Sequence, residues 1–190
     1  MTKKILQVLV IGDTHDSPDI PDKSRFGWFA KHIRKSKPDI VVQIGDFVTL
    51  DSCTHYIRDD SYTAKIEKPI FMKDMESMDS AMEEFNYHLK DFKIKKYLTL
   101  GNHEKRMFRK EDSNPTFYGM CQKEFFGNCK KYDWQVIPYG KYLMLGGVGF
   151  IHAPINPMGK EYGGEASERQ VANKSKIDIV FGHSHRAQDN

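Results

Sequence analysis

The sequence is poor in cysteine and has no pair of cysteines at metal-binding spacing. Only Cys53, Cys121 and Cys129 occur among its 190 residues, and no two of them form a CxxC pair. An odd, scattered set of cysteines argues against a disulfide framework and against a structural zinc ribbon. This usage is typical of a reducing compartment, so we expect a cytoplasmic protein.

Long apolar runs and a large charge of one sign are also missing. No run approaches the roughly 18 apolar residues of a membrane-spanning helix, so we expect no membrane partner. With 29 basic against 26 acidic residues, the net charge of +3 is too small for a chain that coats nucleic acid. The 14 glycines and 8 prolines exclude collagen-like and disordered classes. The length suits one buried core, so we expect residues 1–190 to form a single domain.

Short apolar runs rich in Val and Ile alternate with helical patterns. The runs that predict strands are Ile5–Ile11, Ile40–Ile44, Tyr97–Leu100, Trp134–Pro138, Lys141–Leu145, Val148–Ile151 and Ile177–Phe181. Helices are predicted over Ser24–Ser36, Lys73–Phe92 and about Glu165–Lys174. The second helix carries its methionines on one face, which indicates core packing rather than metal binding.

The order of these elements predicts the fold class. Strands that alternate with helices over the first hundred residues predict a largely parallel sheet. The three strands between residues 134 and 151 are joined by short turns, which predicts an antiparallel meander. The class is therefore α/β, or α+β by some schemes, with a mixed central sheet.

Polar residues follow five of the expected strands at their carboxyl ends. They are Asp13, His15, Asp46, Asn102, His103, His152, His183 and His185. Because the carboxyl ends of strands in an open α/β sheet line one crevice, we expect these side chains to converge. A glycine precedes the polar residues at four of the five ends and is expected to let the backbone bend sharply there.

The donor types predict a metal centre without thiolates. Imidazole and carboxylate together suit Mn, Fe, Zn or Ni. Seven candidate ligands exceed the needs of one ion, and Asp46 has two oxygens that can bridge, so we expect two divalent cations. Asp13 and His15, like His183 and His185, are two residues apart. In an extended segment both members of such a pair face the same side.

Each motif alone also has an ordinary structural interpretation. Asp13-Thr14-His15 is compatible with a strand-to-helix turn capped by Asp16 or Ser17. Asn102 suits a turn, Glu104 suits the first turn of a helix, and a lone His152 suits a buried core. The joint occurrence of all five motifs at strand ends favours the metal centre.

These motifs resemble those of the calcineurin-like metallophosphoesterases, and most closely the small members common in bacteriophages and prophages. The family pattern is Asp-x-His, Gly-Asp, Gly-Asn-His-(Asp/Glu), His and Gly-His-x-His, and all five blocks occur in order between Asp13 and His185. The resemblance implies a four-layer sandwich of mixed β-sheets flanked by helices. It also implies hydrolysis of phosphate monoesters or diesters by in-line attack of a hydroxide that bridges two metals, with manganese preferred to iron, zinc or nickel.

The resemblance also implies a role for each matching residue. One metal would be held by Asp13, His15 and His185, the other by Asn102, His152 and His183, and Asp46 would bridge them. His103 would act in catalysis beside Asp46 and Asn102, by stabilising the transition state or protonating the leaving oxygen.

The sequence departs from the protein Ser/Thr phosphatase branch at three positions. Leu50 and Leu100 stand where that branch has phosphate-binding arginines, and Thr49 replaces the usual Asp partner of the catalytic histidine. These departures disfavour a protein phosphatase. They leave Asp51, Asp16 or a backbone carbonyl as the alternative partners of His103.

The sequence leaves the substrate open. A phosphate-ester hydrolase for a small or nucleotide-like substrate is the main hypothesis, with a nuclease acting on DNA ends and a non-catalytic metal-containing scaffold as alternatives. For the nuclease, the residues that would meet nucleic acid are Lys105, Arg106, Arg109, Lys110, Tyr56, Tyr62 and Tyr118. The basic run is also typical of a solvated helix face, and we favour that interpretation.

Two further features give weaker expectations. Residues 51–69 lack periodicity, which predicts a long loop, and His55 within it is a candidate phosphate contact. The sequence ends five residues after His185, where relatives often add strands, so the fold is minimal or the chain lacks a terminal segment. No pattern in the sequence predicts an oligomeric state.

Overall fold

The computed structural model describes residues 5–54, 70–162 and 167–185. Its strands are β1 Val8–Ile11, β2 Ile40–Gln43, β3 Lys95–Thr99, β4 Trp134–Ile137, β5 Leu143–Leu145, β6 Val148–Ile151 and β7 Ile179–Phe181. Its helices are α1 Ser24–Ser36, α3 Phe71–Leu89, α4 Lys105–Ser113, α5 Met120–Lys131 and α6 Ser167–Lys174, with 3-10 turns at Asp51–Cys53 and Pro115–Phe117.

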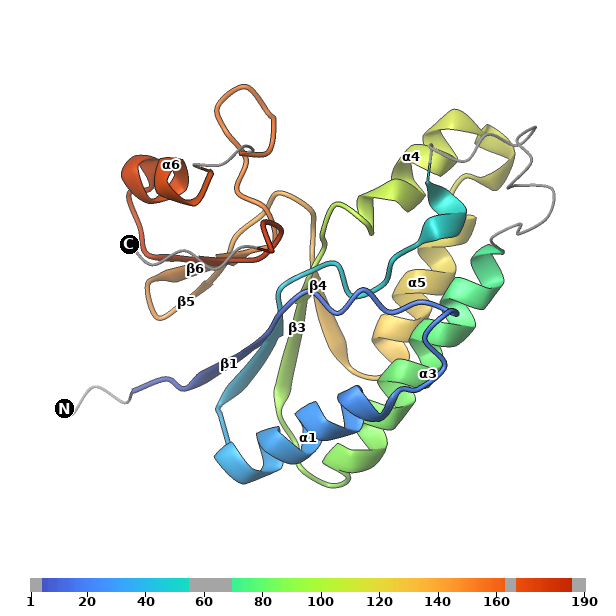
Figure 1. Cartoon of the computed structure of the whole chain (residues 1–190), viewed down its shortest axis with the longest axis horizontal. Coiled ribbons are helices and arrows are strands. Elements are labelled where there is room, and N and C mark those ends of the chain that lie inside the picture. The colour runs from blue at the N-terminus through green and yellow to red at the C-terminus, as the bar shows by residue number, and fades with distance from the viewer. Residues whose placement is uncertain (1–4, 55–69, 163–166, 186–190) are drawn as a thin grey trace.

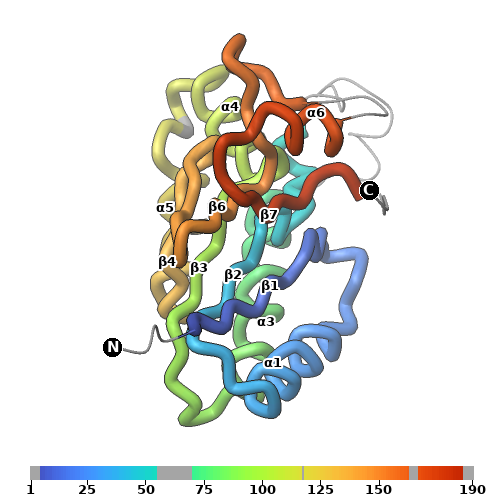
Figure 2. Tube along the Cα trace, turned by 90° about the vertical axis from the view of Figure 1, so that its left-hand side faces the viewer, coloured from blue at the N-terminus to red at the C-terminus, as the bar shows by residue number. Residues whose placement is uncertain are grey.

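The larger sheet is parallel throughout. Its strands lie in the order β1-β2-β3-β4, as Figure 2 shows, and every neighbouring pair is parallel. All four residues of β2 are buried, because the strand has neighbours on both edges and packed layers on both faces. Helices α1, α3 and α5 cover one face of this sheet (Figure 1).

The main core lies between these helices and the sheet. Helix α1 turns Phe26, Ala30 and Ile33 inward, at the spacing that places side chains on one face of a helix. The methionines of α3 are buried as the sequence predicts: Met78 and Met82 have no exposed surface. Their flexible side chains fill this core and take no part in the candidate site.

A second, smaller sheet covers the other face of the parallel sheet (Figure 1). In it β5 pairs antiparallel with β6, and β7 pairs parallel with β6. Phe150 of β6 shares a buried cluster with Ile40 and Val42 of β2 and with Ile44, which follows β2, and this cluster joins the two sheets. The two sheets flanked by helices confirm the predicted α/β class and the metallophosphoesterase-type sandwich.

The predicted antiparallel meander is wrong in its first strand. β4 is the parallel edge strand of the larger sheet, where Lys96 pairs with Trp134. The reason is the pair of helices α4 and α5, which the sequence analysis did not predict as a crossover. A helical crossover returns the chain parallel to the strand it left, and the Trp134 ring then packs beside Phe85 of α3 with 5.5 Å between centroids.

Three strands, β1, β5 and β7, begin two or more residues later than predicted, and β5 begins at Leu143 rather than Lys141. Ile5 is 83% exposed, and β1 begins only at Val8. The preceding residue, Gln7, is held by Asp39: the Gln7 N–H donates to the Asp39 carboxylate at 3.0 Å, and the Asp39 N–H donates to the Gln7 carbonyl at 2.9 Å. Ile177 likewise lies outside β7.

No helix within the described ranges combines the length and apolar character that crossing a membrane requires.

Candidate metal centre

The five motifs lie at the carboxyl ends of β1, β2, β3, β6 and β7, as the sequence predicts. The structure brings their side chains together in three overlapping groups. The groups are Asp13 with His15 and His185, His15 with Asp46 and His103, and Asp46 with His152 and His183. Within each group one donor atom of every residue lies within 4.8 Å of the others. Residues as distant in sequence as Asp13 and His185 therefore form one cluster.

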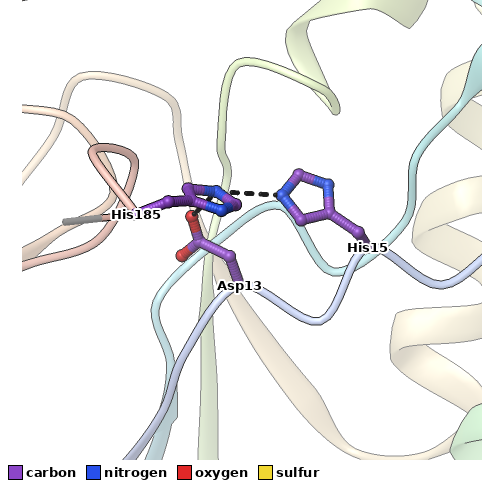
Figure 3. A group of neighbouring side chains, drawn as sticks. All are labelled: Asp13, His15 and His185. Atoms are coloured by element: carbon purple, nitrogen blue, oxygen red, sulfur yellow. Dashed lines mark hydrogen bonds and ion pairs between the residues drawn. The ribbon is translucent and has the colours of Figure 1, made fainter.

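The first group joins the end of β1 to the end of β7 (Figure 3). His185 Nε2 lies 3.0 Å from a carboxylate oxygen of Asp13 and 3.2 Å from His15 Nε2. His15 and His185 thus point ring nitrogens at each other, and burial lowers the pKa of His15. Two neutral imidazoles share only one proton between such nitrogens, whereas a cation accepts a lone pair from each.

Asp46 occupies the centre of the cluster. Its buried carboxylate has one oxygen, Oδ2, 3.2 Å from His152 Nε2 and 3.9 Å from His15 Nε2. Its other oxygen, Oδ1, accepts a hydrogen bond from the His103 N–H at 2.9 Å. Burial raises the pKa of Asp46, but the hydrogen bonds and charges of His152 and His103 together lower it by more, so the pKa lies below its usual range.

The two histidines of the third group, His152 and His183, meet at the side-chain oxygen of Asn102. That oxygen lies 2.9 Å from His152 Nε2 and 2.9 Å from His183 Nδ1. The other ring nitrogen of His152, Nδ1, faces the Ile44 carbonyl at 3.1 Å. A backbone carbonyl behind a ligand histidine fixes the ring and leaves the opposite nitrogen free to bind a metal.

The donors fit divalent cations better than they fit one another. His152 faces the Ile44 carbonyl with one nitrogen and oxygens of Asn102 and Asp46 with the other, so both nitrogens meet acceptors. Burial lowers the pKa of His152, yet the carboxylates of Asp46, Asp13 and Glu104 together raise it by more, and the net pKa is raised. In the described part of the chain, the buried Asp13 Oδ1 has no hydrogen-bond partner. Both observations indicate that positive charge belongs here.

Three motif glycines leave room for side chains of other motifs. A methyl group on Gly45 would lie 2.6 Å from the His152 ring, and one on Gly101 would lie 2.1 Å from Asp46 Oδ1. One on Gly182 would lie 2.3 Å from Asp13 Oδ1. The expected sharp bend holds for Gly45, whose φ is +105°. Gly101 and Gly182 have no positive φ; glycine is required there because a side chain would overlap the neighbouring carboxylate.

Four predicted ligands have a left-handed backbone. The φ values are +44° at His15, +48° at Asp46, +74° at His183 and +52° at His185. The prediction that the two-residue pairs lie in extended segments is therefore wrong. Turning the chain at these residues points their side chains into the cluster, at a cost of about 1–3 kcal/mol each.

The helix-cap alternative for Asp16 does not hold, because α1 begins only at Ser24. Asp16 is buried and accepts from Lys23 Nζ at 2.8 Å, Arg25 Nη2 at 2.6 Å and Ser77 Oγ at 2.7 Å. Its backbone also bonds to the loop after β2: the Asp16 N–H donates to the Phe47 carbonyl at 2.7 Å. This network holds the loop that carries Asp13 and His15 against the loop that carries Asp46.

Glu104 is buried and holds the loop after β3, which carries Asn102, to the loop after β2, which carries Asp46. Its carboxylate accepts the backbone N–H of Gly101 at 2.7 Å, of Asp46 at 3.0 Å and of Val48 at 3.2 Å. Burial raises the pKa of Glu104 to about 7, the Asp46 charge adds to the rise, and the N–H donors oppose it. The interpretation of Glu104 as a first-turn acid is therefore incomplete, because Glu104 also fixes the backbone of Asp46, the central carboxylate.

Comparison with protein families agrees with this geometry. A family model described as calcineurin-like phosphoesterase matches residues 6–187, which is nearly the whole chain. The chain belongs to this family. A search of curated proteins finds no match. Membership in the calcineurin-like phosphoesterases supports metal-dependent hydrolysis of phosphoesters in general, and the three His/Asp groups are candidate positions for the metals.

Among calcineurin-like phosphoesterases, this chain departs from the protein phosphatase pattern at Thr49, and the structure shows what replaces the missing Asp. His103 Nδ1 donates to the backbone carbonyl of Thr49 at 2.8 Å. Of the three alternatives for the partner of His103, the backbone carbonyl is therefore the one found. Asp51 instead lies 3.5 Å from Arg106 Nη1.

Arg106 is a site residue that the sequence indicated only as part of a basic run, which either meets nucleic acid or lies on a solvated helix face. It lies in the first turn of α4, three residues after His103, and is half-buried. Arg106 Nη1 donates to the Thr49 carbonyl at 2.8 Å, and Nη2 lies 3.1 Å from His103 Nε2. Since a guanidinium only donates, His103 Nε2 is the acceptor and the ring is neutral. The three-residue spacing was the signal that predicts this contact.

The rest of the basic run is divided between contacts and solvent. Lys105 Nζ lies over the Tyr139 ring at 4.2 Å from its centroid, whereas Arg109 is exposed. The solvated-face interpretation therefore holds for Arg109 but is wrong for Lys105 and Arg106. Tyr118 is 71% exposed. The candidates His55, Tyr56 and Tyr62 lie outside the described residues.

Proposed function

We propose that this protein hydrolyses phosphate monoesters or diesters of small or nucleotide-like groups at a centre of two divalent cations, with manganese preferred. The observation that carries the proposal is the position of Asp46, whose carboxylate belongs to two donor groups at once. A carboxylate shared between two sets of imidazoles is the arrangement that two-metal hydrolysis requires.

We assign the ligands as the family resemblance implies, with the three groups and the contacts of Asn102 in support. Asp13, His15 and His185 would hold one cation, Asn102, His152 and His183 the other, and Asp46 both. When bound, the cations would supply a water that ionises near neutral pH and would neutralise charge on the phosphate. The polypeptide supplies the positions of the ligands through the bonds from Asp16 and Glu104 to the loops.

Arg106 and His103 are the groups that we expect to meet the phosphate. The guanidinium lies beside His103, at the edge of the donor cluster, although Leu50 and Leu100 replace the arginines of the protein phosphatase branch. Arg106 would donate to phosphate oxygens as their charge increases. His103, held by the Thr49 carbonyl, accepts from Arg106 at Nε2 in this structure, so it would first gain a proton at Nε2 and then pass that proton to the leaving oxygen.

The test combines metal analysis of the purified protein with a substrate panel. The panel contains bis-aryl and mono-aryl phosphates, 2′,3′-cyclic nucleotides and oligonucleotides, assayed with added Mn²⁺ and with the His103→Ala variant. We expect Mn-dependent hydrolysis of at least one small ester and a large loss in the variant. Absence of hydrolysis with every metal tested would favour a metal-containing scaffold.

The same panel separates a nuclease from a small-ester hydrolase. A strand-binding nuclease loses affinity steeply between about 50 and 200 mM salt, because it releases counterions from the phosphate backbone. Hydrolysis of a small aryl diester changes little over this range. We expect the second behaviour, because Lys105 and Arg106 have partners within the protein rather than a free face toward solvent.

A further inference from the structure

Glu161 is a carboxylate beside the candidate centre that belongs to none of the five motifs. It lies between β6 and α6, and its side chain is 29% exposed. One carboxylate oxygen, Oε2, lies 3.6 Å from His183 Nε2. The other accepts a hydrogen bond from the Tyr139 hydroxyl. The side chain therefore lies between a predicted metal ligand and a tyrosine of the β4–β5 connection.

The orientation of the His183 ring indicates how the contact with Glu161 can affect metal binding. The ring directs Nδ1 at the Asn102 oxygen, 2.9 Å away, so Nδ1 is the nitrogen that faces the donor cluster. The opposite nitrogen, Nε2, faces Glu161. At this distance the pair is an ion-pair contact rather than a hydrogen bond. A carboxylate behind a metal-binding imidazole still favours the proton on the nitrogen that faces it and makes the ligand more basic.

The two halves of the centre also differ in charge without Glu161. The first set of ligands contains two carboxylates, Asp13 and the shared Asp46. The second contains only the shared Asp46, with neutral donors from Asn102, His152 and His183. A divalent cation on the second side therefore has one anionic ligand, and Glu161 supplies a second negative charge through His183.

The backbone around Glu161 holds it in this place. Residues 154–162 close on themselves: Ile155 and Glu161 form an isolated antiparallel bridge, and the Asn156 N–H donates to the Lys160 carbonyl at 2.8 Å. Tyr139 is half-buried, and Lys105 Nζ lies over its ring. Burial raises the pKa of Tyr139, so its hydroxyl remains a donor to the carboxylate.

We propose that Glu161 is a positioning residue that orients His183 and strengthens binding of the second cation, with Tyr139 holding the carboxylate in place. This inference rests on the proposed two-cation function. It assigns no contact with substrate to Glu161.

The experiment is a calorimetric Mn²⁺ titration of the full chain, with turnover measured at each Mn²⁺ concentration. We expect wild-type protein to bind two ions. In Glu161→Ala the weaker binding step should lose about tenfold to a hundredfold in affinity while the tighter step stays unchanged. Excess Mn²⁺ should restore the turnover of the variant, and Glu161→Gln, which keeps an acceptor oxygen without the charge, should lose less.

Two further variants serve as control and second test. Glu124→Gln changes an exposed carboxylate on α5 and should leave both binding steps unchanged. Tyr139→Phe removes the hydroxyl donor and should weaken the second step by a smaller factor. If circular dichroism shows that Glu161→Ala does not fold, the result for Tyr139→Phe decides.

The outcomes separate this inference from the proposed function. Wild-type protein that binds fewer than two ions, or hydrolyses no ester, overturns both. Wild-type protein that binds two ions and turns over, together with Glu161 variants whose binding steps are unchanged, overturns only the role of Glu161. Equal weakening of both steps in the folded variant would also overturn it, because that result indicates a general structural effect.

Discussion

The two sheets contribute to the candidate centre in different ways. The parallel sheet supplies all the oxygen donors, Asp13, Asp46 and Asn102, from loops that are tied down by the buried Asp16 and Glu104. The second sheet supplies only imidazoles: His152 is buried, and the last candidate ligand, His185, has a side chain that is 55% exposed. The centre is therefore closed around Asp46 and His152 and opens toward His185.

Packing follows the same division. The helices and the parallel sheet share a continuous core, in which Leu98 of β3 is fully buried. The second sheet contributes Phe150 as its one buried residue in the cluster between the sheets, and Leu143, Leu145 and Val148 are only partly covered. The comparison indicates that the parallel sheet and its helices set the positions of the Asp46 carboxylate and the Asn102 amide. The second sheet covers these groups.

Asp46→Asn should have the largest effect of the variants that test this comparison. The amide removes the charge that both donor groups share, so we expect Mn-dependent turnover to fall about a thousandfold. The fold should persist, because the Asn oxygen still accepts from the His103 N–H. Steady-state kinetics with added Mn²⁺ and a thermal melt check both statements. Wild-type kinetics in this variant would rule out the bridging role.

A matched pair of leucine truncations tests the packing difference. Leu98→Ala in β3 should destabilise the protein by about 2–5 kcal/mol, because it leaves a cavity in a closed core. Leu143→Ala in β5 should cost about 1 kcal/mol, because that side chain is only partly covered. Urea unfolding measures both. Equal losses would show that the second sheet is as firmly packed as the first.

Arg106→Lys tests a residue that follows the parallel sheet and that we expect to contact the phosphate. Lysine keeps the charge but loses the fork that reaches the Thr49 carbonyl and His103 together. A lost hydrogen bond to a charged group is worth about 1.5–3 kcal/mol, so kcat/KM should fall about tenfold to a hundredfold. Arg109→Lys, on the exposed face of the same helix, is the control and should match the wild type.

Thr49→Val should have the smallest effect. The Thr49 side chain donates to the His15 carbonyl at 3.1 Å, but His103 is held by the Thr49 backbone, which valine retains. We expect a loss of about 1 kcal/mol in stability and a change in turnover of less than about fivefold. Loss of activity as large as that of Arg106→Lys would mean that the hydroxyl, rather than the carbonyl, orients His103.

The sequence was sufficient to predict the cluster because each of its parts follows a short apolar strand. A polar residue directly after a buried strand is visible in the sequence, and parallel topology brings such positions to one edge. The spacing of apolar residues on one helical face likewise predicted the helix Ser24–Ser36 at its observed bounds and the buried methionines of α3.

The parts that could not be predicted depend on backbone atoms or on tertiary contacts. The partner of His103 is a carbonyl, which every residue possesses, so no residue type marks it. Glu161 meets His183 only because the chain folds back between β6 and α6, at a spacing of 22 residues. The parallel direction of β4 depended on two helices whose apolar patterns are short and irregular.

The buried carboxylate of Glu104 has a consequence for the internal motion of the centre. It accepts the N–H groups of Gly101, Asp46 and Val48, which belong to two loops, so none of the three amides opens alone without leaving the acceptor partly unpaired. In heavy water, these three protons should exchange at one shared, slow rate that reports opening of the core, whereas amides of the small sheet exchange faster and independently.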